Sequence, residues 1–94
     1  MNAIMKEVHM QIDVHCKWNK IPPMYRLFVN DEMFTERTYV FQAGEYVREN
    51  LIIEAPSGNY EVKIETPSKE SFKLRNLSCS YGDAQIIDNT RFRI

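Results

Sequence analysis

The most constraining feature of the sequence is a strict alternation of apolar and polar residues between Val8 and Trp18. The apolar residues are Val8, Met10, Ile12, Val14, Cys16 and Trp18, and the residues between them are His9, Gln11, Asp13, His15 and Lys17. A period of two places successive side chains on opposite faces of an extended strand. We therefore predict a strand with one buried and one solvated face.

The same alternation recurs along most of the chain, between residues that favour turns. Further strands are expected at 24–30, 33–41, 46–55, 60–65, 72–81 and 85–94. The separating turns include Asn30-Asp31, Gln42-Ala43-Gly44, Pro56-Ser57-Gly58-Asn59 and Gly82-Asp83. About seven strands in 94 residues predict one all-β domain over 1–94. The expected fold is an antiparallel β-sandwich, immunoglobulin-like or jelly-roll-like.

Composition and charge exclude several classes of function. The formal net charge is −1, and 44% hydrophobic with 27% charged residues is typical of a globular domain. Nucleic-acid binding needs a clustered basic surface, and the nearest feature is Arg91 with Arg93 at the end of the chain. No stretch has the apolar length of a signal peptide or a membrane span. We expect neither a nucleic-acid nor a membrane partner.

The two cysteines, Cys16 and Cys79, occupy apolar positions of their alternating segments. A free buried thiol behaves as a small hydrophobic group, so free cysteines are favoured. A disulfide between them and a reactive thiol stay open as alternatives.

Candidate catalytic and metal-binding residues are sparse, and we predict no enzyme, no cofactor and no metal. Asp13 and His15 lie about 7 Å apart on one strand face, which suffices for two ligands but supplies no third. The acid pairs Asp31-Glu32, Glu45 with Glu49, and Asp83 with Asp88 lie near turns, where calcium ligands can converge. Their spacing is not that of a calcium loop, so solvated carboxylates are favoured.

The predicted hairpin from Met24 to Phe41 is apolar on both faces. This pattern favours one of two interpretations. In the first, Phe28, Tyr39 and Phe41 form a contact surface for another protein, because aromatic residues are enriched at such interfaces. In the second, a β-bulge reverses the register halfway and turns every apolar residue inward.

Tyr60 follows the strongest turn of the sequence and begins the next strand. In immunoglobulin-like sandwiches, a tyrosine at this corner donates a hydrogen bond to the preceding backbone. We predict this structural role, a tyrosine corner, for Tyr60. A plain core aromatic is the alternative.

Two segments also carry a resemblance to known proteins. NKIPPMYRLFVNDEMFTERTYVF followed by YVRENLIIEAPSGNYEVKIE is similar to small uncharacterised proteins of tailed bacteriophages, including T4-like phages of marine cyanobacteria. The resemblance covers Asn19 to Glu65 and includes no catalytic motif. It implies a virion accessory or structural component, or a protein that binds a host factor, located in the host cytoplasm or the virion. It supplies no site residues.

These observations lead to one preferred function and two alternatives. The preferred function is a non-enzymatic protein–protein interaction module with a protein partner or as a homo-oligomer. A carbohydrate-binding module is the first alternative, with calcium as an optional ligand. Its binding residues would be Trp18, Tyr39 or Tyr46 together with Asn30, Asp31 and Glu32. An enzyme based on Asp13 and His15 is the second.

Overall fold

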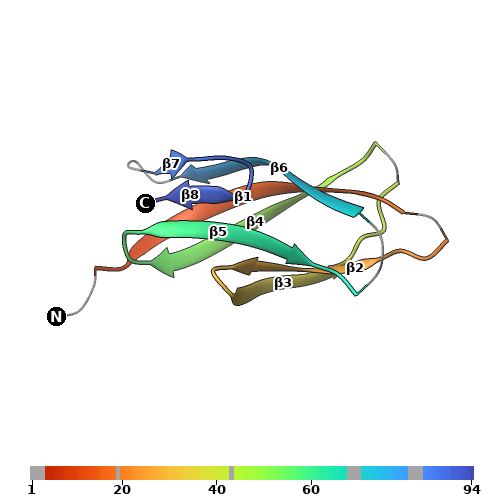
Figure 1. Cartoon of the computed structure of the whole chain (residues 1–94), viewed down its shortest axis with the longest axis horizontal. Helices are drawn as coiled ribbons and strands as arrows, with labels where there is room; N and C mark the ends of the chain where they lie inside the picture. Colours follow the sequence, from red (N-terminus) through yellow and green to blue (C-terminus); the bar gives the residue numbers. More distant parts are fainter. Residues whose placement is uncertain (1–3, 19, 43, 68–70, 81–83) are drawn as a thin grey trace.

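The chain folds into a β-sandwich of two packed antiparallel sheets (Figure 1). The computed structural model describes residues 4–18, 20–42, 44–67, 71–80 and 84–94. Within these ranges the strands are β1 (Lys6–Lys17), β2 (Met24–Val29), β3 (Glu32–Thr38), β4 (Val47–Ala55), β5 (Asn59–Glu65), β6 (Ser71–Ser80), β7 (Gln85–Ile86) and β8 (Arg91–Arg93). The predicted all-β sandwich is therefore confirmed, with eight described strands in place of about seven.

The strand with the strictest alternation, β1, is the centre of the three-stranded sheet, whose order is β4-β1-β6. The apolar residues of β1 from Val8 to Cys16 all face the core and are buried. On the opposite face, His9 is exposed and Gln11 and His15 are half-buried, as expected for the solvated side. Asp13 is the exception, because it is only 1% exposed.

The second sheet has the order β3-β2-β5-β8-β7. This strand order matches the C′, C, F and G strands of an immunoglobulin domain for β3, β2, β5 and β8, while β1 and β4 correspond to B and E. In an immunoglobulin domain, the strand that lies beside B is the first strand of the chain, A. Here β6 takes that position in the sheet, although in the sequence it comes between the equivalents of F and G.

The corner between β4 and β5 carries the chain from one sheet to the other. The Tyr60 hydroxyl donates a hydrogen bond to the Pro56 carbonyl at 2.6 Å. The Tyr60 ring stacks on Phe92 with centroids 5.4 Å apart, and Gly58 exchanges two backbone hydrogen bonds with Ile94. The corner is thus attached to the last strand of the chain.

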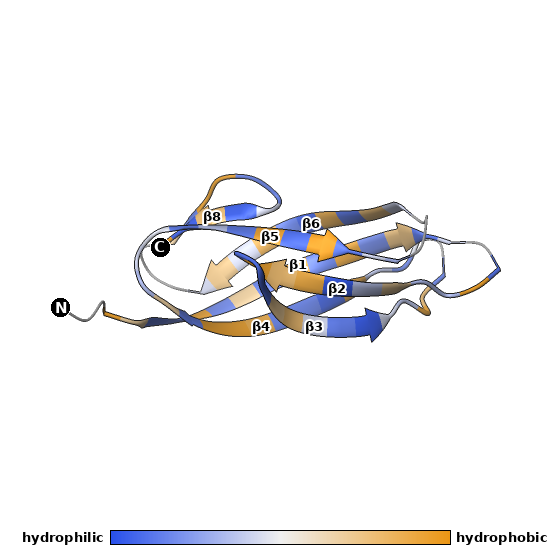
Figure 2. Cartoon of the chain, turned by 60° about the horizontal axis from the view of Figure 1, so that its bottom comes forward, coloured by the Kyte–Doolittle hydropathy of each residue, from blue (hydrophilic) through white to orange (hydrophobic). Residues whose placement is uncertain are grey.

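The core lies between the sheets, and the alternation of hydrophobic and hydrophilic segments can be followed along β5 in Figure 2. Both sheets contribute to one cluster, so neither has a core of its own. Its largest fully buried apolar side chains are Tyr25, Tyr39, Phe92, Met10, Ile12 and Leu27.

The β2–β3 hairpin contains both the tight turn and the bulge considered above. Asn30 and Asp31 have φ values of 46° and 71°, the left-handed backbone that a two-residue hairpin turn requires. The register shifts between Leu27 and Phe28, which leaves an extra residue, Phe34, in β3. The bulge turns Phe34 toward the core, whereas Met33 stays 52% exposed. It therefore accounts for only part of the apolar surplus.

The prediction of one strand over 85–94 was wrong. The segment forms two short strands, because the Asp88 carboxylate organises a turn between them. Its Oδ1 atom accepts hydrogen bonds from the backbone N–H groups of Thr90 and Arg91, both at 2.9 Å. The predicted turn at Gly82-Asp83 lies outside the described residues.

Cys16 and Cys79 are not joined by a disulfide. Cys16 is paired across the sheet with Phe72, and Cys79 with Met10, so the two thiols are separated along β1. Burial raises the pKa of the Cys79 thiol to about 11, which disfavours the reactive thiolate. Among the residues described, no helix combines the length and apolar character needed to cross a bilayer.

Candidate functional site

Two segments far apart in sequence meet at one end of the sandwich, which we call the loop end. They are residues 18–23 between β1 and β2 and 39–46 between β3 and β4, without residues 19 and 43, which lie outside the described ranges. The Trp18 indole donates a hydrogen bond to the Phe41 carbonyl at 2.6 Å, and the Tyr39 amide donates to the Pro23 carbonyl at 2.7 Å. Both segments lie at the right of Figure 1, opposite the β2–β3 turn.

Tyr39 and Phe41, two of the three predicted contact residues, belong to the interior of this end. Tyr39 has 0% exposed surface, and its hydroxyl donates to the Glu45 carbonyl at 2.9 Å. The Tyr39 ring lies 5.5 Å from Phe41 and 5.9 Å from Phe72, in edge-to-face contacts. Phe41 is half-buried against the core. Tyr39 therefore cannot contact a partner in this conformation.

Phe28, the third predicted contact residue, lies elsewhere. It is half-buried and points away from the core, since its neighbours Leu27 and Val29 point inward. Its cross-strand neighbours are Met33 on β3 and Lys63 on β5. The structure thus does not bring Phe28, Tyr39 and Phe41 together on one surface.

Of the exposed apolar residues of the loop end, the sequence analysis named Tyr46 as a candidate sugar contact and did not single out Ile21 or Val40 as contact residues. Ile21 is 77% exposed, Val40 59% and Tyr46 45%. Val40 had been placed inside a strand, but β3 ends at Thr38. The Tyr39 amide still donates to the Pro23 carbonyl, in line with the β2–β3 register, and Pro23 has no N–H group to continue the ladder. An isoleucine between a lysine and two prolines was the signal available for Ile21, because turns seldom contain large apolar residues.

Three cations lie on the outer face of the three-stranded sheet near this end. In the register of β1 with β6, Lys73 is opposite His15, Arg75 is opposite Asp13, and Lys17 is opposite Ser71. Lys17, Lys73 and Arg75 form no ion pair with the described residues. The formal net charge of −1 for the whole chain concealed this local excess of positive charge.

Asp13 is held by two donors from its neighbouring strands. Arg48 on β4 donates through Nε to Oδ1 and Asn76 on β6 donates to Oδ2, each at 2.9 Å. Asn76 occupies the β6 bulge with a φ of 56°. Burial acts to raise the pKa of Asp13, but the hydrogen bonds from Arg48 and Asn76 outweigh it and lower the pKa below its ordinary value.

The alternative in which Asp13 and His15 together bind a metal finds no support in this geometry. Both Asp13 oxygens are occupied, and the His15 ring stacks on Tyr46 with centroids 5.1 Å apart. In the part of the chain that the structure describes, no group of three or more His, Cys, Asp or Glu side chains could hold a metal ion.

The candidate acid pairs are likewise separated or engaged. The Glu45 carboxylate accepts a hydrogen bond from the backbone N–H of Gln42 at 2.8 Å. Glu49 is buried on the inward face of β4. Asp31 is exposed at the hairpin turn, 3.8 Å from the Lys63 ammonium. Asp83 lies outside the described residues.

The two arginines near the end of the chain have partners within it. Arg91 forms a 2.6 Å ion pair with Asp88, and the Arg93 Nε donates to the Asn59 side chain at 2.9 Å. The Arg91 guanidinium, with hydrogen bonds from Thr90, lowers the pKa of Asp88 to about 2.

The expectation of a solvated carboxylate was wrong for Glu49, which is only 4% exposed. It accepts hydrogen bonds from the Tyr25 hydroxyl at 2.7 Å and from the Arg37 Nε at 2.6 Å. Tyr25 and Arg37 belong to the five-stranded sheet and Glu49 to the other, so this cluster joins the sheets. Burial, followed by the hydrogen bond to Glu49, raises the pKa of Tyr25. The sequence signal for a buried Glu49 was its position: it occupies an inward-facing place in a strand whose other inward-facing residues are apolar.

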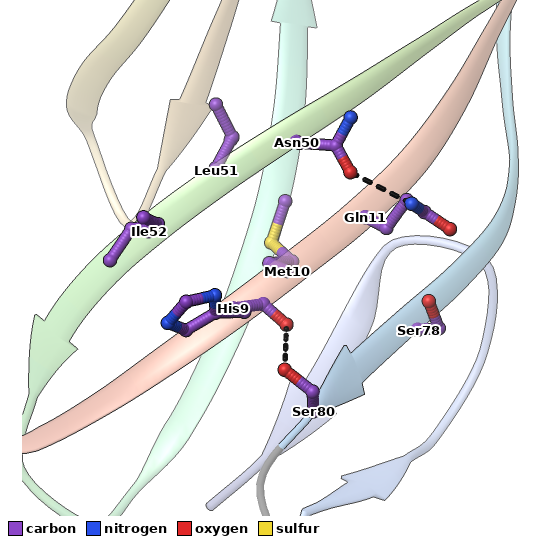
Figure 3. A pocket seen from close by; sticks show the side chains of 8 residues that line it. All are labelled: His9, Met10, Gln11, Asn50, Leu51, Ile52, Ser78 and Ser80. Atoms are coloured by element: carbon purple, nitrogen blue, oxygen red, sulfur yellow. Dashed lines mark hydrogen bonds between the residues drawn. The ribbon is translucent and has the colours of Figure 1, made fainter.

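A shallow hollow of about 320 Å³ lies over the outer face of the three-stranded sheet (Figure 3). Gln11 donates a hydrogen bond to Asn50 at 2.7 Å across its floor, and the Ser80 hydroxyl donates to the His9 carbonyl at 3.2 Å. Ile52, 61% exposed, lines the hollow from β4. The hollow therefore contains amide, hydroxyl and imidazole groups but no convergent acids.

The residues of the carbohydrate hypothesis are divided between two ends of the molecule. Trp18 and Tyr46 lie at the loop end, and Tyr39 is buried there. Asn30 and Asp31 form the turn at the far end of β2. A single sugar cannot contact both groups.

Comparisons with known proteins give no assignment, since no family model, no curated protein and no solved structure matches this chain. The resemblance to phage proteins stays a prediction.

Proposed function

We propose that this protein is a non-enzymatic binding module that contacts another protein through its loop end. The supporting observation is the exposure of Ile21, Val40 and Tyr46 on two segments that are hydrogen-bonded to each other. Large apolar side chains gathered at one end of a small domain are typical of a protein interface.

The charges near the loop end indicate what kind of surface would fit it. Lys17, Lys73 and Arg75 form no ion pair with the described acids, and Glu45 is the one described acid that lines the same hollow as these three cations. An apolar patch bordered by cations fits a partner with an apolar patch bordered by Asp and Glu. Association with such a surface accelerates at low salt, because exposed charges are screened over about 10 Å at 0.1 M.

The engagement of the acids favours binding over catalysis. Asp13 and Glu49 have arginine partners, and His9 bonds to Glu7 at 2.9 Å. His9 and His15 lie six residues apart on an extended strand, about 20 Å. These groups do not converge on a point where a substrate atom could react.

The resemblance of Asn19 to Glu65 to tailed-phage proteins implies that this module is itself a virion accessory or structural component, or a phage protein that binds a host factor. A β-sandwich is compatible with either role, and fold alone does not choose between them.

Site-specific photocrosslinking tests the proposal. A benzoylphenylalanine replaces Val40, with a matched control at the exposed Lys63 of β5, and each protein is irradiated in an extract of its native cells. We expect one protein adduct from position 40 that is absent from position 63. Excess unlabelled wild-type protein should suppress this adduct. Excess of the variant I21D/V40D, whose folding is checked by circular dichroism, should not suppress it. Equal adducts from both positions, or equal competition by wild type and variant, would contradict the proposal.

Carbohydrate binding is the second candidate, supported only by Tyr46, which is 45% exposed although its ring stacks on His15 and lies 5.8 Å from the Arg48 guanidinium. A glycan array read with and without calcium tests it, and the Tyr46→Ala variant should lose any signal.

A further inference from the structure

The sandwich has four edge strands, and three of them carry features that hinder pairing with another chain. In the described structure, β3 is interrupted by the bulge at Phe34 and β6 by the bulge at Asn76, while β7 has only two residues. Bulges and short length are the devices by which proteins protect a sheet edge from further pairing.

The fourth edge, β4, has neither a bulge nor a short length, and the charges that it carries are Arg48, Glu54 and the inward-pointing Glu49. It is nine residues long, contains no proline or glycine, and pairs with β1 without a register shift from Val47 to Ala55. Its described backbone pairs only with β1, so the N–H and C=O groups of its other edge form no strand ladder. A regular strand of this length is the kind of edge that accepts another strand.

The outward side chains of β4 match those of a second copy of β4 that runs antiparallel to it. When two copies of β4 run antiparallel with Leu51 opposite Leu51, Arg48 faces Glu54 of the second copy, twice. Asn50 then faces Ile52 of the second copy. Opposite charges in directly opposed positions stabilise strand pairs, and like charges destabilise them.

Other registers lose this match. A shift by one residue turns the inward face of one strand toward solvent, against the burial of Leu51 and Ile53. A shift by two residues places Asn50 opposite Asn50, or Ile52 opposite Ile52, and separates the charges.

We propose that β4 pairs with β4 of a second copy, so that two three-stranded sheets become one continuous antiparallel sheet. The Arg48 Nε bonds to Asp13 at 2.9 Å and its guanidinium carbon lies 5.8 Å from the Tyr46 ring centroid, yet the side chain is 49% exposed, so pairing with Glu54 of the second copy would use the nitrogens that Asp13 does not occupy. Ile52, 61% exposed in one chain, gains a neighbour in the pair. This surface is distinct from the exposed apolar residues of the loop end, and the inference does not depend on the proposed function.

Sedimentation equilibrium tests the pairing on the full chain. We expect a species of about twice 11.2 kDa and a dissociation constant that Glu54→Lys raises about tenfold, because two attractive contacts become repulsive. Glu7→Lys is the matched control, since Glu7 faces Glu54 within the sheet but lies one strand away from the edge. A monomer at every concentration, or equal effects of the two variants, would overturn the proposal.

A disulfide experiment tests the register. Asn50→Cys and Ile52→Cys are prepared separately, and the crosslink is measured for each alone and for their mixture, with wild type giving the background of Cys16 and Cys79. The proposed register predicts at least about fivefold faster crosslinking in the mixture, because directly opposite residues lie about 5 Å apart and diagonal ones 7–8 Å. Crosslinking that is equally fast in all three samples would reject it.

Discussion

Asp13 and Glu49 are both nearly inaccessible, at 1% and 4% exposure, and both are bound by an arginine from another strand. They differ in what they connect. Asp13 links β1 to its neighbours within one sheet, through Arg48 and Asn76. Glu49 links one sheet to the other.

This difference indicates two separate uses of a buried charge. The Asp13 contacts fix the β6 bulge and the register around it, which are properties of one sheet. The Glu49 contacts fix how the sheets face each other, where apolar packing alone is non-directional. Because Arg37 and Arg48 are about half exposed, each arginine keeps contact with water while its carboxylate does not.

The largest effect is expected at Glu49. Glu49→Ala leaves the Tyr25 hydroxyl buried without its acceptor and opens a cavity, so we expect a loss of about 3–4 kcal/mol in the free energy of unfolding. Urea denaturation measures it. Glu49→Gln keeps the shape and an acceptor and should lose about half as much; equal losses in the two variants would show that the charge, not the cavity, dominates.

Asp13→Asn is expected to be milder, at about 1–2 kcal/mol, because Arg48 can rehydrate. The folded-state pKa of Asp13 lies below its unfolded value of 3.8, so its contribution is complete above that pH and is lost as pH falls through the folded pKa. Wild type should thus lose stability below about pH 4 more steeply than Asp13→Asn. Asp88→Asn, which removes the other acid with a lowered pKa, is the control and should retain the Asp13 contribution.

Two substitutions of the bulge residue Asn76 separate the effect of its backbone conformation on stability from the effect of its side chain. Asn76→Gly keeps the left-handed φ of 56° without strain but removes the donor to Asp13, and we expect a loss of about 1 kcal/mol. Asn76→Ala adds strain and should lose about 1 kcal/mol more. Thermal unfolding followed by circular dichroism compares the two, and identical midpoints would exclude backbone strain at this position.

The smallest effects are expected when each arginine becomes lysine. Arg37 bonds to both Glu49 oxygens, at 2.6 and 3.4 Å, whereas a single bond from Arg48 reaches Asp13. Lysine cannot reproduce a forked contact, so Arg37→Lys should cost about 1 kcal/mol and Arg48→Lys about half of that. Chemical denaturation at low and high salt checks the order, and a larger loss for Arg48→Lys would reverse the comparison.

Most of the fold could be predicted from local patterns. The alternation from Val8 to Cys16 located the central strand, and Asn30-Asp31 located the hairpin turn. The division of 85–94 into two strands could not be predicted in this way, because it depends on the Asp88 carboxylate accepting backbone bonds from the following residues.

The candidate site was less accessible to sequence analysis. Tyr39 and Phe41 were identified as unusual, but whether an aromatic ring points outward depends on the exact end of β3. Ile21 and Val40, which carry the exposed surface, are distant in sequence, and their two loops are joined by the hydrogen bonds of Trp18 with Phe41 and of Tyr39 with Pro23.

The sequence by itself determined that this chain forms extended strands with one apolar face each, because side-chain direction along a strand is a local property of the backbone. Only the tertiary structure decided which strands lie at the edges, which charges stay unpaired, and that Asp13 and Glu49 are buried. Those properties arise from contacts between residues far apart in the chain, and a local pattern contains no information about them.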